Sequence, residues 1–429
     1  MCSSDLKALI AAGKHAQHMR MPNGFGITPA NPVINHRAVH DHVHGVIAAI
    51  APNDSVERFT GLGVRVIRAT GKFIDKSTVE AGDLKIKARR FVIATGSSPL
   101  VPPIPGLERV PFFTNETIFE NAQKLDHLIV IGGGPIGIEL AQAHARLGSK
   151  VTVVEAMKAL GKDDRELTDM VLRHLRDEGL TIREGARVEG IEPLAGGLIR
   201  VKAAQDGQPV TIDGSHLLIA TGRKPNIDSL KLDAAGVKFD RTGIKVNSGL
   251  VTSNSRVYAI GDVIGGLQFT HVANYHAGIV IRRALFRLPA TVNRAIIPWV
   301  TFTDPEIAQV GLNEDEARKK HGRIKVLRWP FHENDRAQAD RTTDGLVKAV
   351  VSSNGRILGA TIAGPAAGEL IQMWALAVSS GLNIKAMAGM ISPYPTLSEV
   401  NKRAATSYYV AKLANPLVRG AVKLLARFG

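Results

Sequence analysis

The sequence predicts an α/β protein with two related strand-rich domains and a separate C-terminal α+β domain. The run FVIATGSSP at 91–99 is closely repeated as LLIATGRKP at 217–225, which indicates two related domains. Between the copies lies a strand–turn–helix–strand pattern. From Ile297 the residue pattern changes and predicts the strands of an antiparallel sheet. A chain of 429 residues is also too long for one hydrophobic core.

Each copy of the repeat is an apolar run that ends in Ala-Thr-Gly and has a proline soon after it. We expect a buried strand that stops at the Thr-Gly turn, because glycine lets the backbone approach a ligand or another chain segment closely. Thr95, Gly96 and Gly222 are therefore candidate binding residues.

The segment HLIVIGGGPIGIELAQAHARLGSKVTVVEA fills 127–156. Its apolar runs predict strands at 128–131 and 151–154, and the periodic stretch between them predicts a helix at about 135–147. This order is a βαβ unit with a glycine-rich first turn.

The glycine turn has the form Gly132-x-Gly134-x-x-Gly137, and Glu155 ends the following strand. In this context the pattern indicates dinucleotide binding: the glycines allow the tight turn, backbone approach to the pyrophosphate, and close helix packing. Glu155 would accept hydrogen bonds from the ribose hydroxyls and repel a 2′-phosphate, which favours NAD over NADP. The alternative is an ordinary βαβ turn with a solvated Glu155.

The run AIGDV at 259–263 predicts a strand that ends in Gly261-Asp262. The Asp262 carboxylate could accept hydrogen bonds from a polyol or ribityl chain. Alone, Gly-Asp is a common turn; together with the two Ala-Thr-Gly turns and the nucleotide motif it becomes informative.

The C-terminal part predicts antiparallel strands, with SSNG at 352–355 as a hairpin turn, followed by helices at about 366–381 and 396–414. The tail at 416–429 places Arg419, Lys423 and Arg427 on one helix face. We expect it to pack on the C-terminal domain, with contact to an anionic membrane surface as the alternative.

Composition narrows the class of protein further. The chain is 45% apolar with 42 glycines, which is typical of a soluble α/β protein, and its single cysteine excludes a disulfide framework and suits the cytoplasm. The net charge of +15 is spread along the chain without interleaved aromatics. We therefore expect no nucleic-acid partner, since anionic cofactors explain part of this charge.

Eight short motifs, spread from residue 7 to residue 399, occur in an order that resembles one enzyme family. They are KALI (7–10), ATGSSP (94–99), IGGGPIGIE (131–139), ATGRKPN (220–226), YAIGDV (258–263), THVA (270–273), WVTFTDPEIAQVG (299–311) and YPTLSE (394–399). The chain resembles the pyridine nucleotide-disulfide oxidoreductases, a family of FAD enzymes. It is most similar to the dihydrolipoamide dehydrogenases and mercuric reductases within that family.

The resemblance implies two Rossmann-like domains, with the FAD domain split by the inserted NAD domain, and a C-terminal α+β dimerisation domain. The expected ranges are 1–121 and 247–290 for FAD, 122–246 for NAD, 296–415 for dimerisation and 416–429 for the basic tail. The implied protein is a homodimer that passes hydride from NADH through FAD to a small-molecule disulfide or another electron acceptor.

The resemblance also implies roles for individual residues. Asp262 would hold the ribityl chain of FAD, and Thr270 and His271 would lie against the pyrimidine side of the flavin. Glu139 would pair with Lys7 beside the flavin, where hydride arrives.

The start of the chain departs from the family pattern. In the family, KALI follows a Cys-x4-Cys pair and an earlier Gly-x-Gly-x-x-Gly, but no such glycine motif precedes residue 132 and Cys2 is one position out of register. We expect Met1–Leu6 to be a translated sequencing adapter on a truncated chain that lacks the first βαβ unit; a natural homologue that has shed its disulfide is the alternative. Neither gives Cys2 a redox role, and both imply weak FAD binding.

Tyr394 stands where dihydrolipoamide dehydrogenases carry the histidine that protonates the leaving thiol in the partner subunit, and the supporting Glu399 is kept. Mercuric reductases also have tyrosine in this region, but their C-terminal cysteine pair is absent here. The acceptor therefore stays open. The alternatives are an NADH:quinone-type dehydrogenase and an inactive NAD-binding fragment.

The run NHRAVHDHVH raises the possibility of a metal site. His36 and His40 would share a helix face, whereas His40, His42 and His44 would share a strand face. Since no cysteine and no nearby pair of acidic residues completes either set, we expect a solvated helix with some interface histidines and no metal.

Overall fold

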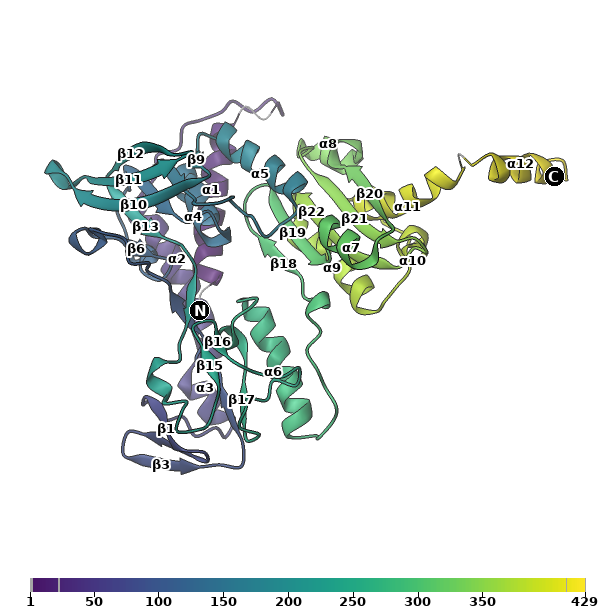
Figure 1. Cartoon of the computed structure of the whole chain (residues 1–429). Coiled ribbons are helices and arrows are strands. Elements are labelled where there is room, and N and C mark those ends of the chain that lie inside the picture. Colours follow the sequence, from purple (N-terminus) through teal and green to yellow (C-terminus); the bar gives the residue numbers. More distant parts are fainter. Residues whose placement is uncertain (1–2, 22–23, 414, 429) are drawn as a thin grey trace.

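The computed structural model describes residues 3–21, 24–413 and 415–428, so Cys2 lies outside the described part (Figure 1). Two five-stranded sheets dominate the structure, one parallel and one antiparallel. A smaller third part lies beside them. The expected α/β class, with an appended α+β domain, is confirmed.

The N-terminal part begins with helices and continues into short strands. Its elements are α1 (Ser3–Arg20), α2 (His36–Ile50), η1 (Ala51–Asp54), α3 (Val56–Gly61), β1 (Gly71–Asp75), β2 (Thr78–Ala81), β3 (Leu84–Lys87), β4 (Phe91–Ile93), β5 (Ser97–Pro99), η2 (Leu107–Arg109), β6 (Phe113–Thr114) and η3 (Ile118–Glu120). Strands β1, β2 and β3 form an antiparallel sheet. Helix α1 packs lengthwise on the inserted domain (Figure 1).

The inserted domain is built on the parallel sheet β6-β13-β7-β8-β9. Its elements are β7 (His127–Ile131), α4 (Pro135–Arg146), β8 (Lys150–Val154), α5 (Arg165–Asp177), β9 (Thr181–Arg183), β10 (Ala186–Pro193), η4 (Ala195–Gly197), β11 (Ile199–Gln205), β12 (Gln208–Gly214) and β13 (His216–Ile219). The elements that follow, β14 (Arg223–Pro225), η5 (Asp228–Leu230), β15 (Phe239–Asp240) and β16 (Gly243–Ile244), lie with β4 and β5 of the N-terminal part. The predicted βαβ unit is β7-α4-β8. Leu128, Ile129 and Val130 are fully buried because both sheet faces are covered.

After the inserted domain, the chain packs again on the N-terminal part and completes the third, smaller part of the structure. Strand β17 (Val257–Ala259) pairs in parallel with β4, and η6 (Gly261–Ile264) and α6 (Thr270–Ala284) follow. In the described residues this parallel sheet has two strands. Val92 of β4 is 47% exposed, although the strands of a parallel sheet are usually buried on both faces.

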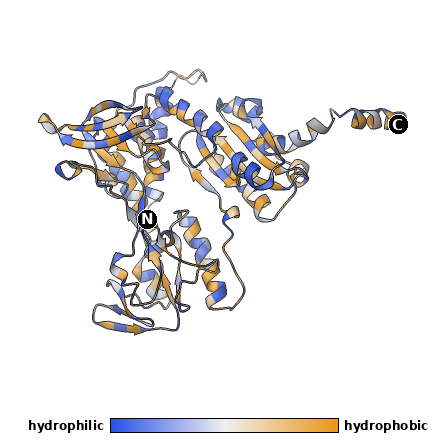
Figure 2. Ribbon diagram, in the orientation of Figure 1, coloured by the Kyte–Doolittle hydropathy of each residue, from blue (hydrophilic) through white to orange (hydrophobic). Residues whose placement is uncertain are grey.

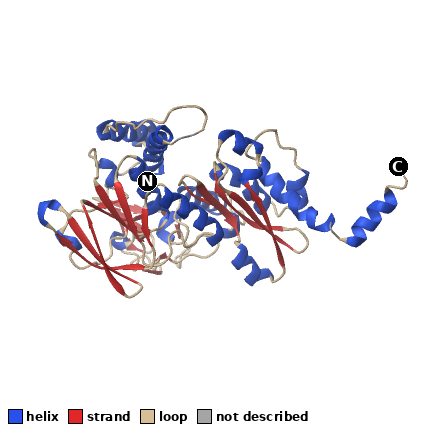
Figure 3. Ribbon diagram, turned by 90° about the horizontal axis from the view of Figure 1, so that it is seen from above, coloured by secondary structure: helices blue, strands red, loops and turns tan. Residues whose placement is uncertain are grey.

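The C-terminal domain is the antiparallel sheet β18-β19-β22-β21-β20 with helices on both sides (Figure 3). Its elements are η7 (Arg294–Ile296), β18 (Trp299–Thr301), β19 (Glu306–Gly311), α7 (Glu314–His321), β20 (Ile324–Pro330), η8 (Phe331–Glu333), α8 (Asp335–Asp340), β21 (Leu346–Ser352), β22 (Ile357–Gly364), α9 (Ala367–Ser379), α10 (Ile384–Gly389), α11 (Glu399–Leu413) and α12 (Pro416–Leu425). The predicted SSNG hairpin joins β21 to β22. Helix α10 was not predicted.

Both faces of this second sheet are buried, and its strands are largely apolar (Figure 2). All eight residues of β22 are buried. Ala308 and Ile362 face the core that contains α9, whereas Ile307 and Ala363 face the core of the inserted domain. Buried Lys348 joins the two domains through Asp164, at 2.8 Å.

The C-terminal helix α12 projects away from the molecule (Figure 1). It has no buried residue, and Leu417 is 83% exposed. The expectation that this segment packs on the C-terminal domain is therefore wrong for the single chain. Among the described residues, no helix is long and apolar enough to cross a membrane.

Candidate functional site

A cleft of about 1080 Å³ opens where the three parts of the chain meet. It is lined by the start of α1, the turn after β4, the start of α4, the turn after β17, the first turn of α6 and strand β18. The structure brings eight of the candidate site residues into its wall: Lys7, Thr95, Gly96, Glu139, Gly261, Asp262, Thr270 and His271.

Lys7 and Glu139 form an ion pair in this wall. Lys7 Nζ lies 2.6 Å from Glu139 Oε2, and the Glu139 side chain is only 5% exposed. The second carboxylate oxygen of Glu139 accepts the Phe302 backbone N–H at 3.0 Å. Lys7 Nζ also lies 4.0 Å from the centroid of the Phe302 ring. The pair thus joins α1, α4 and the segment after β18.

The two Ala-Thr-Gly turns pair with each other through the segments that follow them. Strand β5 runs antiparallel to β14, and Thr95 Oγ1 donates to the Asn226 carbonyl at 2.7 Å. In the reciprocal contact, Thr221 Oγ1 donates to the Leu100 carbonyl at 2.8 Å. Gly222 has φ +138°, a conformation that favours glycine.

Asp262 is held by the two-stranded ribbon that β5 and β14 form. Ser97 Oγ donates to Asp262 Oδ2 at 2.6 Å, and Arg223 Nε donates to Ser97 Oγ at 2.7 Å. The Gly261 N–H donates to Nδ1 of His276 at 3.2 Å. Burial lowers the pKa of His276, which keeps the ring neutral and able to accept this bond. The carboxylate is thereby fixed in the cleft wall.

The first turn of α6 adds a partial positive charge to the cleft. Thr270 begins the helix, and no side chain caps its free N–H groups. His271 Nε2 hydrogen-bonds to the Pro298 carbonyl at 2.8 Å, and its ring stacks on Phe269. His271 therefore ties α6 to the C-terminal domain.

The glycine turn of the inserted domain has the form that a pyrophosphate requires. A Cβ on Gly137 would lie 2.0 Å from the Gly132 carbonyl oxygen, whereas a Cβ on Gly134 would meet nothing within 4 Å. Glu155 accepts the backbone N–H groups of Gly133 at 2.7 Å and Met157 at 2.8 Å. The open space at Gly134 and the fixed Glu155 carboxylate fit a dinucleotide.

The fit to a flavin is partial. Asp262 and the start of α6 suit a ribityl chain and a ring with partial negative charge. The sequence holds no second Gly-x-Gly-x-x-Gly for the other half of an FAD molecule.

Tyr394 and Glu399 lie elsewhere, outside the wall of the cleft. Tyr394 is 70% exposed, and its hydroxyl donates to Asp335 Oδ2 at 2.9 Å. This hydrogen bond raises the pKa of Tyr394 above its usual range. Glu399 begins α11, and its nearest cation is Arg403, at 3.9 Å.

The sequence reasoning missed three residues that shape the cleft: Ser97, Arg223 and Phe302. Ser97 and Arg223 directly follow the two predicted glycine turns, so their position was a usable signal. Phe302 comes from the C-terminal domain, and no local pattern links it to Lys7.

Fold and cleft together define a dinucleotide-binding α/β protein with an appended antiparallel domain. The chain belongs to the pyridine nucleotide-disulphide oxidoreductase family: the family model matches residues 8–277, and its dimerisation domain matches residues 297–405. FAD and NAD, the expected cofactors, are those of this family.

Several named proteins are similar to the chain. A mercuric reductase from Lysinibacillus sphaericus is 38% identical over 80% of the chain and 63% of that protein. A dihydrolipoyl dehydrogenase from Thermus scotoductus is 34% identical over 94% of the chain and 87% of that protein. The solved structure of LpdA from Mycobacterium tuberculosis matches with a TM-score of 0.86 and 26% identity, over 95% of the chain and 90% of LpdA. The chain spans 63% and 64% of the length of the first two mercuric reductases it matches.

Proposed function

We propose that the chain carries the nucleotide sites of a cytoplasmic NADH-dependent flavoprotein oxidoreductase. In the overall reaction NADH, a proton and an oxidised acceptor give NAD⁺ and the two-electron-reduced acceptor. Bound FAD would supply the two-electron relay between them. The observation that carries this proposal is the ion pair between Lys7 and the buried Glu139, in a cleft whose wall comes from both nucleotide-binding regions.

The chain's own residues have separable tasks in this proposal. Lys7 places its ammonium group at the cleft wall, and Glu139 and the Phe302 ring fix its position. Asp262 accepts hydrogen bonds from hydroxyl groups, and Glu155 selects NADH because a 2′-phosphate beside a carboxylate is repelled.

The acceptor is a disulfide or a related compound in the first proposal. One observation favours a second candidate, the reduction of a quinone directly at the cleft. The sequence has a single cysteine, so this chain alone offers no thiol pair to relay electrons to a disulfide.

A homodimer belongs to the same proposal, and the match to the family's dimerisation domain supports it. The exposed Tyr394 hydroxyl would then exchange its hydrogen bond to Asp335 for one donated to the acceptor in the cleft of the partner subunit.

The experiment mixes the purified chain with FAD and follows NADH oxidation with a disulfide or a quinone as acceptor. Glu155→Arg is expected to move the preference from NADH towards NADPH by about tenfold or more. The wild type should oxidise NADH only when FAD is added in excess, because the chain binds flavin weakly. A wild type that oxidises no NADH in excess FAD would refute the proposal.

A further inference from the structure

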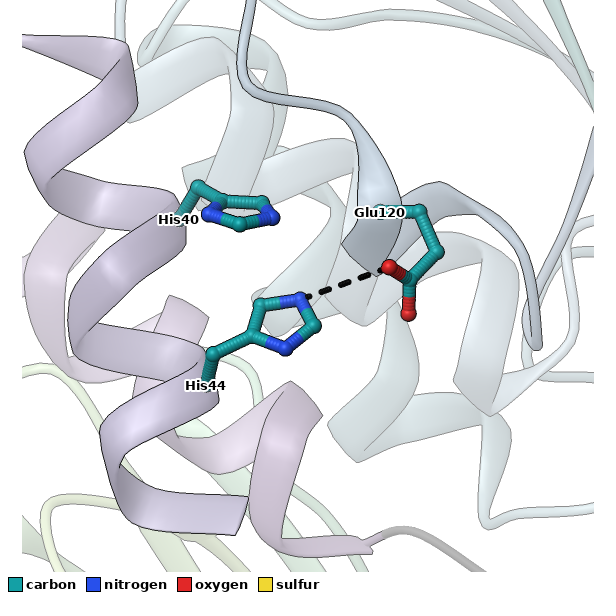
Figure 4. A group of neighbouring side chains, drawn as sticks. All are labelled: His40, His44 and Glu120. Carbon is teal, nitrogen blue, oxygen red and sulfur yellow. Dashed lines mark ion pairs between the residues drawn. The ribbon is translucent and has the colours of Figure 1, made fainter. Parts of the chain in front are cut away.

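Two histidines and one glutamate from separate segments meet on the side of the molecule formed by α2 and η3 (Figure 4). His40 and His44 belong to α2, and Glu120 ends η3. One ligand atom of each lies within 4.8 Å of the others. We propose that His40, His44 and Glu120 form a binding site for a divalent transition-metal ion that prefers imidazole, represented by Zn²⁺.

The helix supplies the rigid half of this site. Positions four apart face the same side of an α-helix, and the two imidazole rings lie 4.1 Å apart between centroids. The helix is capped by Asn35, whose side chain accepts the Ala38 N–H at 3.0 Å. Paired histidines at this spacing are a frequent metal-binding arrangement.

Glu120 supplies the third ligand. His44 Nε2 lies 3.7 Å from Glu120 Oε2, too far for a hydrogen bond. Two ligand atoms that share a tetrahedral Zn²⁺, each about 2.0–2.2 Å from it, lie roughly 3.3–3.6 Å apart. A small side-chain rotation would therefore bring this pair to the separation that a shared ion imposes.

Asp41 completes the arrangement behind His40. His40 Nδ1 and Asp41 Oδ1 are 2.9 Å apart, within hydrogen-bond distance. A proton on Nδ1 leaves the Nε2 lone pair of His40 free for a metal. A carboxylate behind a ligating histidine is the usual supporting contact in such sites.

The alternative is that these residues bind no metal and have a structural role only. His44 Nε2 lies 3.2 Å from the Phe119 carbonyl, so His44 could simply donate a hydrogen bond that holds η3 on α2. Two imidazoles and a carboxylate suit Zn²⁺, Cu²⁺ or Ni²⁺, whereas Ca²⁺ and Mg²⁺ prefer all-oxygen sites. Metal titration separates the two cases.

The sequence-based expectation of no metal here considered only residues near the histidine run. Helix α2 excludes the strand reading, so His42 points away from the pair. Glu120 is distant in sequence and became visible only in the fold.

The test is calorimetric titration of the EDTA-treated, untagged chain with ZnCl₂ near neutral pH. We expect one Zn²⁺ per chain, with affinity reduced by about tenfold or more in His40→Ala, His44→Ala and Glu120→Gln. His42→Ala, an exposed histidine on the same helix, is the matched control and should bind as the wild type does. Circular dichroism checks that each variant is folded.

A second measurement concerns the geometry. Asp41→Asn should weaken Zn²⁺ binding by roughly 10–100-fold while keeping one ion per chain. Co²⁺ in place of Zn²⁺ should give visible absorption that disappears in His44→Ala. Absence of stoichiometric Zn²⁺ binding in the wild type, or equal affinity in the wild type and the His40→Ala/His44→Ala double variant, would overturn the proposal.

Discussion

Lys7 on the first helix and Glu139 on α4 lie 132 residues apart in the chain and 2.6 Å apart in space. Glu139 is almost fully buried, whereas about a third of the Lys7 side chain is exposed. The pair therefore fixes the position of α1 on the inserted domain, and with it one wall of the cleft.

Removing the positive charge should destabilise the protein. Lys7→Met leaves the buried Glu139 carboxylate with a single backbone hydrogen bond, so we expect the free energy of unfolding to fall by about 1–3 kcal/mol. Urea denaturation measures this. Lys14→Met, on the same helix but 47% exposed and 3.6 Å from Asp304, should change stability by less than about 1 kcal/mol. Equal losses of unfolding free energy in the two variants would mean that the Lys7–Glu139 pair stabilises the fold no more than an exposed ion pair does.

Two glycines of the nucleotide turn should respond differently to alanine. Gly137→Ala puts a Cβ against the Gly132 carbonyl and should cost about 1–3 kcal/mol of stability. Gly134→Ala meets no protein atom, so stability should change by less than about 1 kcal/mol while NADH affinity falls, because the methyl group fills the space of the pyrophosphate. Thermal unfolding and NADH titration separate the two effects. A Gly134→Ala variant with unchanged NADH affinity would place the pyrophosphate elsewhere.

Acid should weaken the junction between the inserted and C-terminal domains. Burial works to raise the pKa of Glu178, but hydrogen bonds from His174 and Arg146 outweigh it and lower this pKa from 4.5 to about 2. Arg146 also pairs with Asp304 at 2.9 Å. Because the folded-state pKa is depressed, the stabilisation is present above pH 4.5 and is lost as the pH falls towards 2.

The measurement is the free energy of unfolding between pH 6 and pH 3, with a loss on the order of 2 kcal/mol expected from this group. Glu178→Gln should flatten the curve in this range. Asp213→Asn, which removes an exposed carboxylate paired with Arg200, is the control and should flatten the curve much less than Glu178→Gln does, because solvent screens this pair. A Glu178→Gln curve as steep as that of the wild type would assign the acid sensitivity to other groups.

The β5–β14 ribbon should support the flavin site. Arg223→Met removes the donor to Ser97 and the cation 3.7 Å from Asp262, so we expect FAD affinity to fall by about tenfold. Flavin fluorescence titration measures this. Lys224→Met lies on the same strand, is exposed and pairs only with Asp228 among the described contacts, so it should leave FAD affinity unchanged. Equal affinities for Arg223→Met and wild type would remove Arg223 from the site.

Local patterns predicted much of this fold. The β7-α4-β8 unit follows from an apolar run, a glycine turn and a periodic helix that agree with one another. The pairing of β5 with β14 could not be read in this way, although both copies of the repeat were visible, because sequence similarity does not show which strands are neighbours.

At the site, most of the features that could not be predicted from local sequence patterns are contacts between distant segments. The pairing of Lys7 with Glu139 was expected only from the family resemblance, and Phe302 was missed altogether. The position of Glu120 beside His44 could not be predicted either, nor could the projection of helix α12 away from the molecule. Neither periodicity nor composition specifies which surfaces meet.

The most direct test of the central claim is the rate at which NADH reduces flavin in the FAD-reconstituted chain, followed anaerobically by flavin absorbance in a stopped-flow instrument. We expect Lys7→Met to slow this step by about tenfold or more, equivalent to about 1.4 kcal/mol in the barrier, while NADH affinity and the Lys14→Met control stay near wild type. Equal rates in Lys7→Met and the wild type would contradict the placement of hydride transfer beside the Lys7–Glu139 pair.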